Sequence, residues 1–288
     1  MADRQKILVL GANGMLGNAV YRTFATSSGY DVVGTVRNAS SKIALPDSAS
    51  GKLLAGVDVE QVDSLVAALE KVRPDVVINC IGLVKQLVGA NDPLVTLPIN
   101  AMLPHRLARL AALVDARLIH VSTDCVFTGR KGNYLESDAP DAQDLYGRSK
   151  LLGEVDYPNA VTLRTSIIGT ELGSAHGLVG WFLAQSGAVK GFTKAVFSGL
   201  PTAVLAQIMR DHVIHNRELR GVWHVSAKAI AKYDLLQLVS AEYSKDIQIT
   251  PDDQLVIDRS LDSSRFREAT GWTPPCWPDL IAQMRQFG

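Results

Sequence analysis

The chain has 288 residues, of which 47% are hydrophobic and 20% charged, and its 29 basic side chains equal its 29 acidic ones in number. This is an ordinary globular composition, large enough for one domain or for two that share a core. A balanced charge argues against nucleic acid or an anionic membrane as the partner.

The N-terminal segment, the cysteines and the histidines bear on the location of the protein, on disulfides and on metal binding. The apolar run near the N-terminus is far too short for a signal sequence or a membrane span, so we expect a cytoplasmic protein. The 3 cysteines are too few for a disulfide framework, and Cys80 and Cys125 stand in apolar runs that predict buried free thiols. His212 and His215 have no third ligand in a zinc-like pattern, so we predict no metal site.

Short apolar runs alternate with amphipathic segments along the first half of the chain. The apolar runs predict parallel strands buried on both faces, and apolar residues three or four apart predict helices. In chain order we predict a strand at Lys6–Ala12, a helix at Met15–Ser28, a strand at Tyr30–Arg37, a short strand before Asp58, a helix at Glu60–Val72, a strand at Asp75–Gly82, a helix at Pro98–Val114, a strand at Arg117–Asp124, a helix at Leu145–Val155 and a strand at Ala160–Ile168.

This alternation predicts an α/β fold with a doubly wound parallel Rossmann sheet, because crossovers between parallel strands are right-handed. After Ile168 the pattern loosens, with a helix predicted at Pro201–His215 and a strand at Val222–Ser226. The rest of the C-terminal part predicts a smaller lobe over the carboxyl ends of the strands. We assign residues 1–169 and 196–225 to a cofactor-binding Rossmann domain and residues 170–195 and 226–288 to a substrate-binding lobe.

Three glycines at a regular spacing follow the first strand directly and open a helix. Gly11 permits a tight turn, Gly14 lets the backbone approach a pyrophosphate, and Gly17 lets helix and strand pack closely. The helix N-terminus offers unpaired N–H groups and a positive dipole end to phosphates. The segment therefore predicts a dinucleotide site formed by Gly11, Asn13, Gly14, Met15, Leu16 and Gly17.

The second strand ends at Arg37, where enzymes that prefer NAD usually carry an acid that holds the ribose 2′-hydroxyl. An arginine there can pair with the 2′-phosphate of NADP, although a solvated arginine at a strand end is the alternative. We therefore predict NADPH as the cofactor, with NADH as a second one that the site accepts.

The spacing GxxGxxG resembles that of the short-chain dehydrogenase/reductase superfamily. The resemblance implies that Asp58 contacts the adenine amino group and that Val59 lies beside the ring, although Asp58 could also cap the helix that begins at Glu60. It further implies that the chain passes along the cofactor at Cys80, Ile81 and Gly82.

A hydroxyl-bearing strand end is followed by a tyrosine and a lysine four residues apart on a predicted helix. Tyr146 and Lys150 lie on one face of that helix, and the ammonium is expected to lower the pKa of the phenol. A tyrosine tuned in this way can exchange a proton with a carbonyl or alcohol oxygen, and the Thr123 hydroxyl could hold that oxygen. These residues predict an oxidoreductase site.

Nearly the whole chain resembles the dTDP-4-dehydrorhamnose reductase family. The residues that carry this resemblance are the glycine segment, Ser122–Phe127, Tyr146–Glu154, Leu163–Ser166, Pro201–Thr202 and Leu261–Trp272. The resemblance implies that Thr123, Tyr146 and Lys150 are catalytic, that Thr165 and Ser166 lie near the nicotinamide, and that Asn100 supports the lysine through water. It also implies an NADPH-dependent reduction of a nucleotide-linked 4-keto-6-deoxyhexose in deoxysugar synthesis.

Two departures from the family pattern lie beside the expected sugar site. Cys125 stands where the family usually has tyrosine, and Gly82–Pro98 differs from the usual reductase segment. Related dehydratases carry an acid at the position of Cys125, so dehydration is disfavoured. The candidate substrate residues are Lys85, Ser122, Cys125 and Arg259. Arg259 is interpreted either as a ligand of the substrate diphosphate or as the partner of Asp258 or Asp262 in a salt bridge.

Two other functions remain open. An epimerase or epimerase-reductase of the same fold would need a further acid/base pair, for which Lys85 is a candidate, with a solvated loop lysine as its alternative. The regulatory beta subunit of methionine adenosyltransferase resembles the same family but acts as a binding partner; the joint presence of Thr123, Tyr146 and Lys150 favours an enzyme. A homodimer is an expected assembly.

Overall fold

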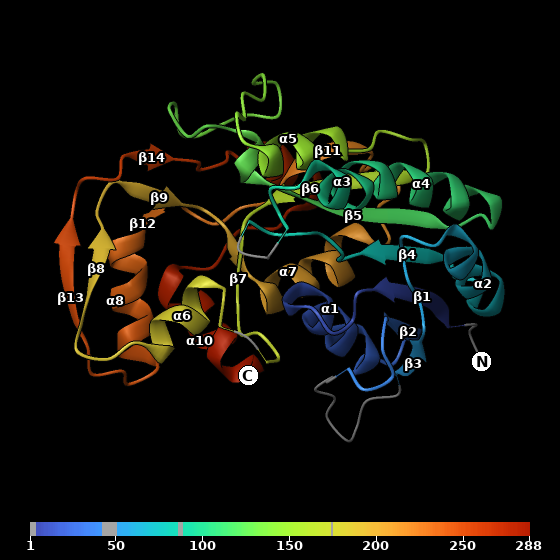
Figure 1. Ribbon diagram of the computed structural model, residues 1–288, viewed down its shortest axis with the longest axis horizontal. Helices are drawn as coiled ribbons and strands as arrows, with labels where there is room; N and C mark the ends of the chain where they lie inside the picture. The colour runs from blue at the N-terminus through green and yellow to red at the C-terminus, as the bar shows by residue number, and fades with distance from the viewer. Residues whose placement is uncertain (1–3, 42–50, 86–88, 174) are drawn as a thin grey trace.

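The structure is a computed structural model that describes residues 4–41, 51–85, 89–173 and 175–288. Its centre is a seven-stranded sheet in which every neighbouring pair is parallel, in the order β3-β2-β1-β4-β5-β6-β11 (Figure 1). The strands are β1 (Gln5–Leu10), β2 (Tyr30–Val36), β3 (Lys52–Ala55), β4 (Val76–Asn79), β5 (Arg117–Thr123), β6 (Ala160–Thr165) and β11 (Gly221–His224). The predicted strands and the doubly wound α/β fold are confirmed.

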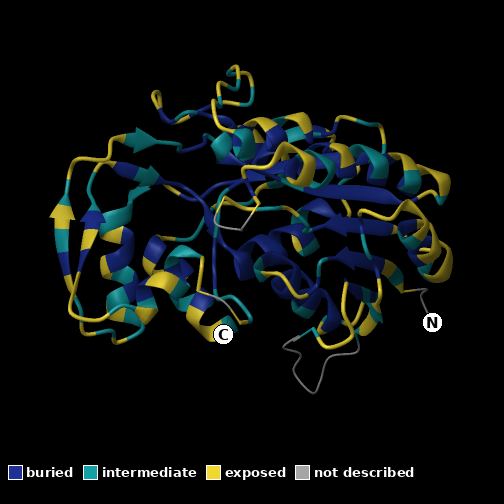
Figure 2. Ribbon diagram, in the orientation of Figure 1, coloured by how far each residue is buried: buried dark blue, intermediate teal, exposed yellow. Residues whose placement is uncertain are grey.

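Both faces of the sheet are covered, which explains why its strands are almost continuously apolar. Most of the sheet is drawn in the colour of buried residues in Figure 2. Along β1, Ile7 and Val9 enter one core, and Leu8 and Leu10 enter the other. The first core also holds side chains of α1 (Met15–Ala25) and α7 (Thr202–Ile208), and the second holds side chains of α2 (Val62–Val72) and α4 (Leu103–Leu113).

Two predicted helices have different beginnings and geometry from those expected. The helix predicted at Pro98–Val114 begins earlier, as α3 (Pro93–Leu97), and passes through a π-helical turn at Pro98–Met102 before α4. Asp92 caps it by accepting the N–H of Leu94 at 2.9 Å. The helix α7 likewise runs into a π-helical turn at Met209–Val213. Prolines at the start of a helix are common, so Pro98 falsely indicated the beginning.

Of the remaining elements, β8, β9, β12, β13, β14 and α8 lie beyond one end of the sheet, on the left of Figure 1, whereas α5 lies over the sheet. Outside the main sheet, β8 pairs with β13, β9 with both β12 and β14, and β7 with β10. Residues 169–195, which follow the point where the sequence pattern loosens, contain the helix α6 and the strand β8. The division into two domains stays a prediction. The elements are α5 (Leu145–Leu152), β7 (Ile167–Ile168), α6 (Leu178–Ala184), β8 (Ala188–Phe192), β9 (Ala195–Phe197), β10 (Leu200–Pro201), β12 (Ile230–Ala231), α8 (Lys232–Glu242), β13 (Gln248–Asp252), β14 (Ile257–Asp258), α9 (Ser264–Thr270) and α10 (Trp277–Phe287).

The cysteines are free thiols, as predicted. Cys80 and Cys125 are half-buried rather than fully buried, and Cys276 is exposed. Within the described ranges, no helix has the length and apolar character needed to cross a membrane.

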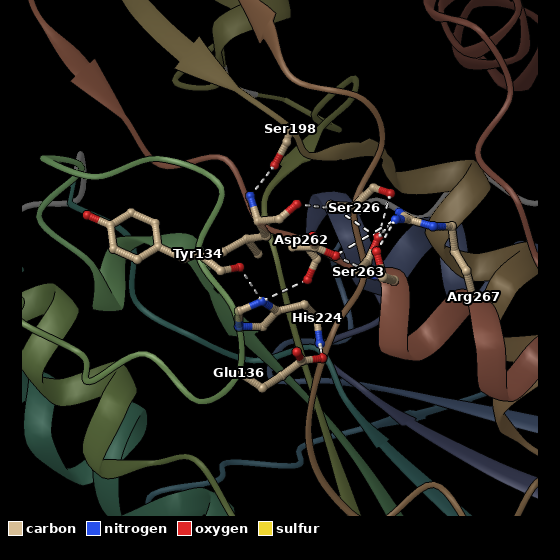
Figure 3. Close-up of polar contacts among 10 residues, drawn as sticks. Tyr134, Glu136, Ser198, His224, Ser226, Asp262, Ser263 and Arg267 are labelled. Carbon is tan, nitrogen blue, oxygen red and sulfur yellow. Dashed lines mark hydrogen bonds and ion pairs between the residues drawn. The ribbon is translucent and has the colours of Figure 1, made fainter.

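A hydrogen-bonded cluster around His224 joins the end of β11 to the C-terminal segment (Figure 3). The backbone N–H of His224 donates to Glu136 at 2.9 Å, and its Nδ1 lies 3.0 Å from the Tyr134 carbonyl and 3.1 Å from that of Asp262. Ser226 donates to the Leu261 carbonyl at 2.9 Å. Two distant parts of the chain are therefore held at the edge of the sheet.

The other ring nitrogen of His224 accepts from Arg164 at 2.9 Å. Arg164 also forms a buried, two-pronged ion pair with Glu154, with distances of 2.8 and 2.5 Å. Since Nδ1 faces two carbonyl acceptors and Nε2 accepts, the ring is neutral with its proton on Nδ1. Burial, followed by the charge of Arg164, lowers the pKa of His224 to about 4.

This depressed pKa predicts a pH-dependent stability. In the unfolded chain His224 binds a proton near its ordinary pKa of 6.5, whereas in the folded chain it binds one only near 4. The contribution of neutral His224 to the free energy of unfolding is therefore complete above pH 6.5. It is lost as the pH falls to 4, by about 3 kcal/mol. We expect His224→Asn to show a flatter decline of unfolding free energy over this range in urea titrations. A decline as steep as that of the wild type would contradict the assignment.

Candidate active site

The glycine segment adopts the geometry that its spacing predicts. Gly11 has a left-handed φ of 79°, and a Cβ on Gly17 would lie only 1.9 Å from the carbonyl oxygen of Gly11. Gly14 is the N-cap of α1, with no side-chain cap and no acidic residue in the first turn. The N–H groups of that turn therefore face no competing side chain, as a phosphate site at a helix N-terminus requires.

Three further predicted cofactor residues follow the neighbouring strands β2, β3 and β4. The side chain of Ile81 packs against Gly11, where an added Cβ would meet Ile81 Cγ1 at 2.8 Å. Asp58 accepts the N–H of Glu60 at 3.1 Å and so closes the turn before α2, although the N-cap itself is Gln61. Arg37 is exposed just beyond the end of β2, and no carboxylate in the described part of the chain forms an ion pair with it.

The three predicted catalytic residues meet at the carboxyl end of β5. Thr123 ends that strand, and its hydroxyl is close enough to the phenol of Tyr146 to lower the pKa of that phenol. The same hydroxyl lies 3.1 Å from Asp124 Oδ1 and accepts the N–H of Cys125 at 3.2 Å. Lys150, one helical turn after Tyr146 on α5, is only 6% exposed and donates to the Val121 carbonyl at 2.8 Å.

Two glycines allow α5 to pack closely against this end of the sheet, and the side chain of Asn100 is hydrogen-bonded to it. A Cβ on Gly147 would lie 2.3 Å from the carbonyl of Cys125, and one on Gly153 would lie 2.0 Å from that of Asn100. The Asn100 side chain accepts the backbone N–H of Leu83 at 2.9 Å and donates to the carbonyl of Leu83 at 3.0 Å. It also donates to the Ser149 hydroxyl at 3.2 Å. Asn100 therefore joins the chain after β4 to the helix that carries Tyr146 and Lys150.

Burial dominates the electrostatics of the two catalytic titratable groups. It lowers the pKa of Lys150 to about 8, against the opposing effect of Glu154. It raises the pKa of Tyr146 above the ordinary value for a phenol, while the side chain of Thr123 acts in the opposite direction. The phenol pKa was expected to be lowered by the ammonium; in the protein without a ligand it is raised instead, because burial outweighs the one effect that lowers it, that of Thr123. A neutral phenol is the form that can donate a proton.

Two cationic side chains approach Tyr146 and its neighbours. Lys85 forms an ion pair with Asp144 at 2.8 Å, and its Nζ lies 5.4 Å from the centre of the Tyr146 ring. Lys85 is nevertheless exposed, in a turn after β4, so its interpretation as a solvated loop lysine stays open. Arg259 donates through Nε to the Phe127 carbonyl at 2.8 Å, and its Nη1 lies 3.6 Å from the sulfur of Cys125.

The salt-bridge interpretation of Arg259 is wrong. Among the described residues, Asp262 pairs with Arg267 at 3.8 Å instead, and Asp258 accepts the N–H of Ser260 at 2.9 Å. The guanidinium of Arg259 is thereby left facing the catalytic end of β5.

One predicted substrate residue points away from the site. The hydroxyl of Ser122 donates to Glu154 at 2.7 Å, on the face of β5 opposite to Thr123, since side chains alternate along a strand. The carboxyl that does lie at the site is that of Asp124, which the sequence interpretation passed over. Asp124 accepts the Thr123 hydroxyl at 3.1 Å, and burial raises its pKa against the opposing effects of Arg259 and of the Thr123, Cys125 and Ser166 side chains. Its place between Thr123 and Cys125 in the strand-end motif was the available signal.

Thr165 and Ser166 lie on the neighbouring strand end. Thr165 is buried, and its hydroxyl donates to the Ser166 carbonyl at 3.2 Å. The effect of Ser166 on the pKa of Asp124 indicates that the ends of β5 and β6 lie close together beside Thr123. This end of the sheet is where ligands of doubly wound folds bind.

A glycine segment at a bare helix N-terminus, joined by one sheet to a Thr–Tyr–Lys cluster, defines an oxidoreductase-type protein of the extended short-chain dehydrogenase/reductase class. The chain matches the family model described as RmlD substrate binding domain over residues 5–257. The chain therefore belongs to this family, as its motifs predict.

Individual relatives fall into two groups. The chain is 29% identical to "Methionine adenosyltransferase 2 subunit beta" of Danio rerio over 245 residues, which cover 80% of this chain and 72% of that protein. It is 34% identical to "Probable low-salt glycan biosynthesis reductase Agl14" of Haloferax volcanii over 178 residues, which cover 60% of this chain and 57% of that protein.

Solved structures of similar fold include two that cover nearly the whole chain. A dTDP-4-dehydrorhamnose reductase from Bacillus anthracis, in complex with NADP, has a TM-score of 0.82 at 19% identity and covers 100% of both chains. A hypothetical dTDP-4-dehydrorhamnose reductase from Sulfolobus tokodaii has a TM-score of 0.76 at 27% identity, covering 95% of this chain and 98% of the other.

Proposed function

We propose that the protein uses NADPH to reduce the keto group of a nucleotide-linked 4-keto-6-deoxyhexose. The observation that carries this proposal is the meeting of the Thr123 hydroxyl, the neutral Tyr146 phenol and the buried Lys150 at one strand end. The intact set favours an enzyme over a protein that only keeps the fold. Its relatives include proteins named as reductases of this class.

Each catalytic side chain has a role that follows from its position. Bound NADPH supplies the hydride to the carbonyl carbon. Tyr146 donates its proton to the carbonyl oxygen as charge develops there, and Thr123 donates a hydrogen bond to the same oxygen. Lys150, held by the Val121 carbonyl, supplies positive charge beneath the phenol and offers its remaining N–H groups to the ribose hydroxyls of the cofactor.

The proton donor can be tested directly at Tyr146. Tyr146→Phe keeps the ring but removes the proton that the reduction consumes. We expect kcat to fall by about 10²- to 10⁴-fold, with an unchanged dissociation constant for NADPH and an unchanged unfolding free energy to within about 0.5 kcal/mol. Stopped-flow oxidation of NADPH with the keto-sugar would measure the rate. A rate within a few-fold of the wild type would refute the assignment of Tyr146 as the acid.

The proposed preference for NADPH rests on Arg37. Its guanidinium is exposed and has no competing ion pair in the described ranges, so it is available to a 2′-phosphate. We expect Arg37→Ala to weaken NADPH binding by about tenfold or more while leaving NADH binding nearly unchanged. Fluorescence titration measures both, with Arg4→Ala, at the opposite end of β1, as the control. Equal losses for the two cofactors would contradict the role.

Arg259 is proposed to contact the substrate, because its guanidinium faces the catalytic strand end and forms no ion pair with the two nearby carboxylates. A sugar nucleotide carries a diphosphate that suits such a group. We expect Arg259→Ala to raise the KM for the sugar nucleotide by at least about tenfold, with NADPH affinity unchanged. Arg217→Ala, an exposed arginine at the amino end of β11, is the control. An unaltered KM would show that Arg259 has a structural task only.

A second candidate function is that of a binding subunit without turnover, which the similarity to methionine adenosyltransferase beta subunits favours. The two functions differ in one outcome, since a binding subunit would hold the cofactor without oxidising it in the presence of any keto-sugar. An epimerase-reductase is a third outcome, for which the pair formed by Lys85 and Asp144 near Tyr146 offers an acid/base group.

A further inference from the structure

A small buried polar region lies beneath Lys150, where β4 and β5 separate. The last residue pair that joins these two strands is Asn79 and His120, which are 1% and 0% exposed. The next residue along β5 is Val121, whose carbonyl accepts the ammonium of Lys150 at 2.8 Å. His120 is therefore the residue immediately before the backbone group that holds the catalytic lysine.

The hydrogen bonds of Asn79 fix the proton of His120. Oδ1 of Asn79 accepts the N–H of Ile81 at 3.1 Å, which leaves the amide nitrogen to donate to Nδ1 of His120 at 3.1 Å. A ring nitrogen that accepts carries no proton, so the neutral imidazole carries it on Nε2. Burial, followed by the charges of Lys150 and His105, holds the pKa of His120 well below its ordinary value, and the ring is neutral.

The resulting Nε2–H group of His120 is buried, and none of the described residues accepts its hydrogen bond. A buried donor without an acceptor is unfavourable, because it has lost its hydrogen bond to bulk water. The nearby ammonium of Lys150 also has donors beyond the one that it gives to Val121. Two neighbouring donor groups can both be satisfied by one water oxygen, and buried waters typically bind such otherwise unpaired groups. On the Gly82 side of the ammonium, an added Cβ would lie 3.8 Å from Nζ, in ordinary van der Waals contact.

We propose that His120 is a positioning residue whose Nε2–H holds an internal water against the ammonium of Lys150. The water solvates a charge that is otherwise buried and so keeps Lys150 protonated while Tyr146 gives up its proton. The other charged group facing Lys150 is Glu154, which also favours the ammonium, and His105 faces His120 from α4. The kinetic consequence rests on the proposed reduction, whereas the water and the position of the proton do not.

The test compares two substitutions of His120. His120→Phe keeps a planar ring but removes the donor, and His120→Gln retains an amide N–H that can reach the same water. The reaction needs the ammonium, so kcat falls as the pH rises through the pKa of Lys150, which is about 8 before ligands bind. We expect this alkaline limb to move about one pH unit lower in His120→Phe and to stay near the wild-type position in His120→Gln, with NADPH affinity unchanged in both.

The same limb in all three proteins, or equal shifts in the two variants, would overturn the proposal, since equal shifts indicate a packing effect. Two measurements on the wild type need neither turnover nor a foldable variant. We expect nitrogen NMR of labelled histidine to show His120 protonated on Nε2, and a high-resolution crystal structure to show a water within about 3.5 Å of both Nε2 and Lys150 Nζ. A proton on Nδ1, or no water at that point, would refute the proposal even if the protein is only a binding subunit.

Discussion

The close approach of α5 to the carboxyl end of β5 is the constraint on which the site depends. Backbone meets backbone at two places, Gly147 against the Cys125 carbonyl and Gly153 against the Asn100 carbonyl, where a Cβ would lie within 2.3 and 2.0 Å. No side chain larger than hydrogen fits at either place. This seating brings Tyr146 to the Thr123 hydroxyl and buries Lys150 deeply enough to lower its pKa to about 8.

A chain of buried polar groups connects this helix to the C-terminal segment. Glu154, just after α5, accepts from Ser122 and from Arg164, and Arg164 continues to His224, which contacts the backbone of Asp262. A buried ion pair is tolerated only when its remaining polar atoms have partners, and each of these groups has one. The same carboxylate raises the pKa of Lys150 against the effect of burial, so the network that holds the C-terminal segment also favours the charged lysine.

The sheet and the catalytic set could be predicted from sequence because their signals are local. Strands buried on both faces are continuous apolar runs, and the glycine spacing and the four-residue step from Tyr146 to Lys150 each describe one short segment. The two π-helical turns could not be predicted, since the apolar spacing of a helix does not reveal where its hydrogen bonds shift by one residue.

Long-range contacts account for the other differences. Arg259 is held at the site by a hydrogen bond to the carbonyl of Phe127, 132 residues away in the chain. In the local sequence, Asp258 and Asp262 were equally reasonable ion-pair partners for this arginine. Ser122 was expected beside the substrate, but the alternation of β5 turns its hydroxyl to Glu154. Whether the pKa of Tyr146 is raised or lowered depends on how deeply the fold buries the phenol. The spacing of residues along one helix does not reveal that burial.

The central claim, hydride transfer to a keto-sugar at the Tyr146 site, is tested most directly by isotope transfer. The protein would be incubated with NADPH deuterated at C4 of the nicotinamide and a nucleotide-linked 4-keto-6-deoxyhexose, and the sugar product analysed by NMR and mass spectrometry. The account predicts one deuterium at C4 of the hexose for each NADP⁺ formed. Tight binding of NADPH without NADP⁺ formation across a panel of such sugars would contradict it and favour the binding subunit.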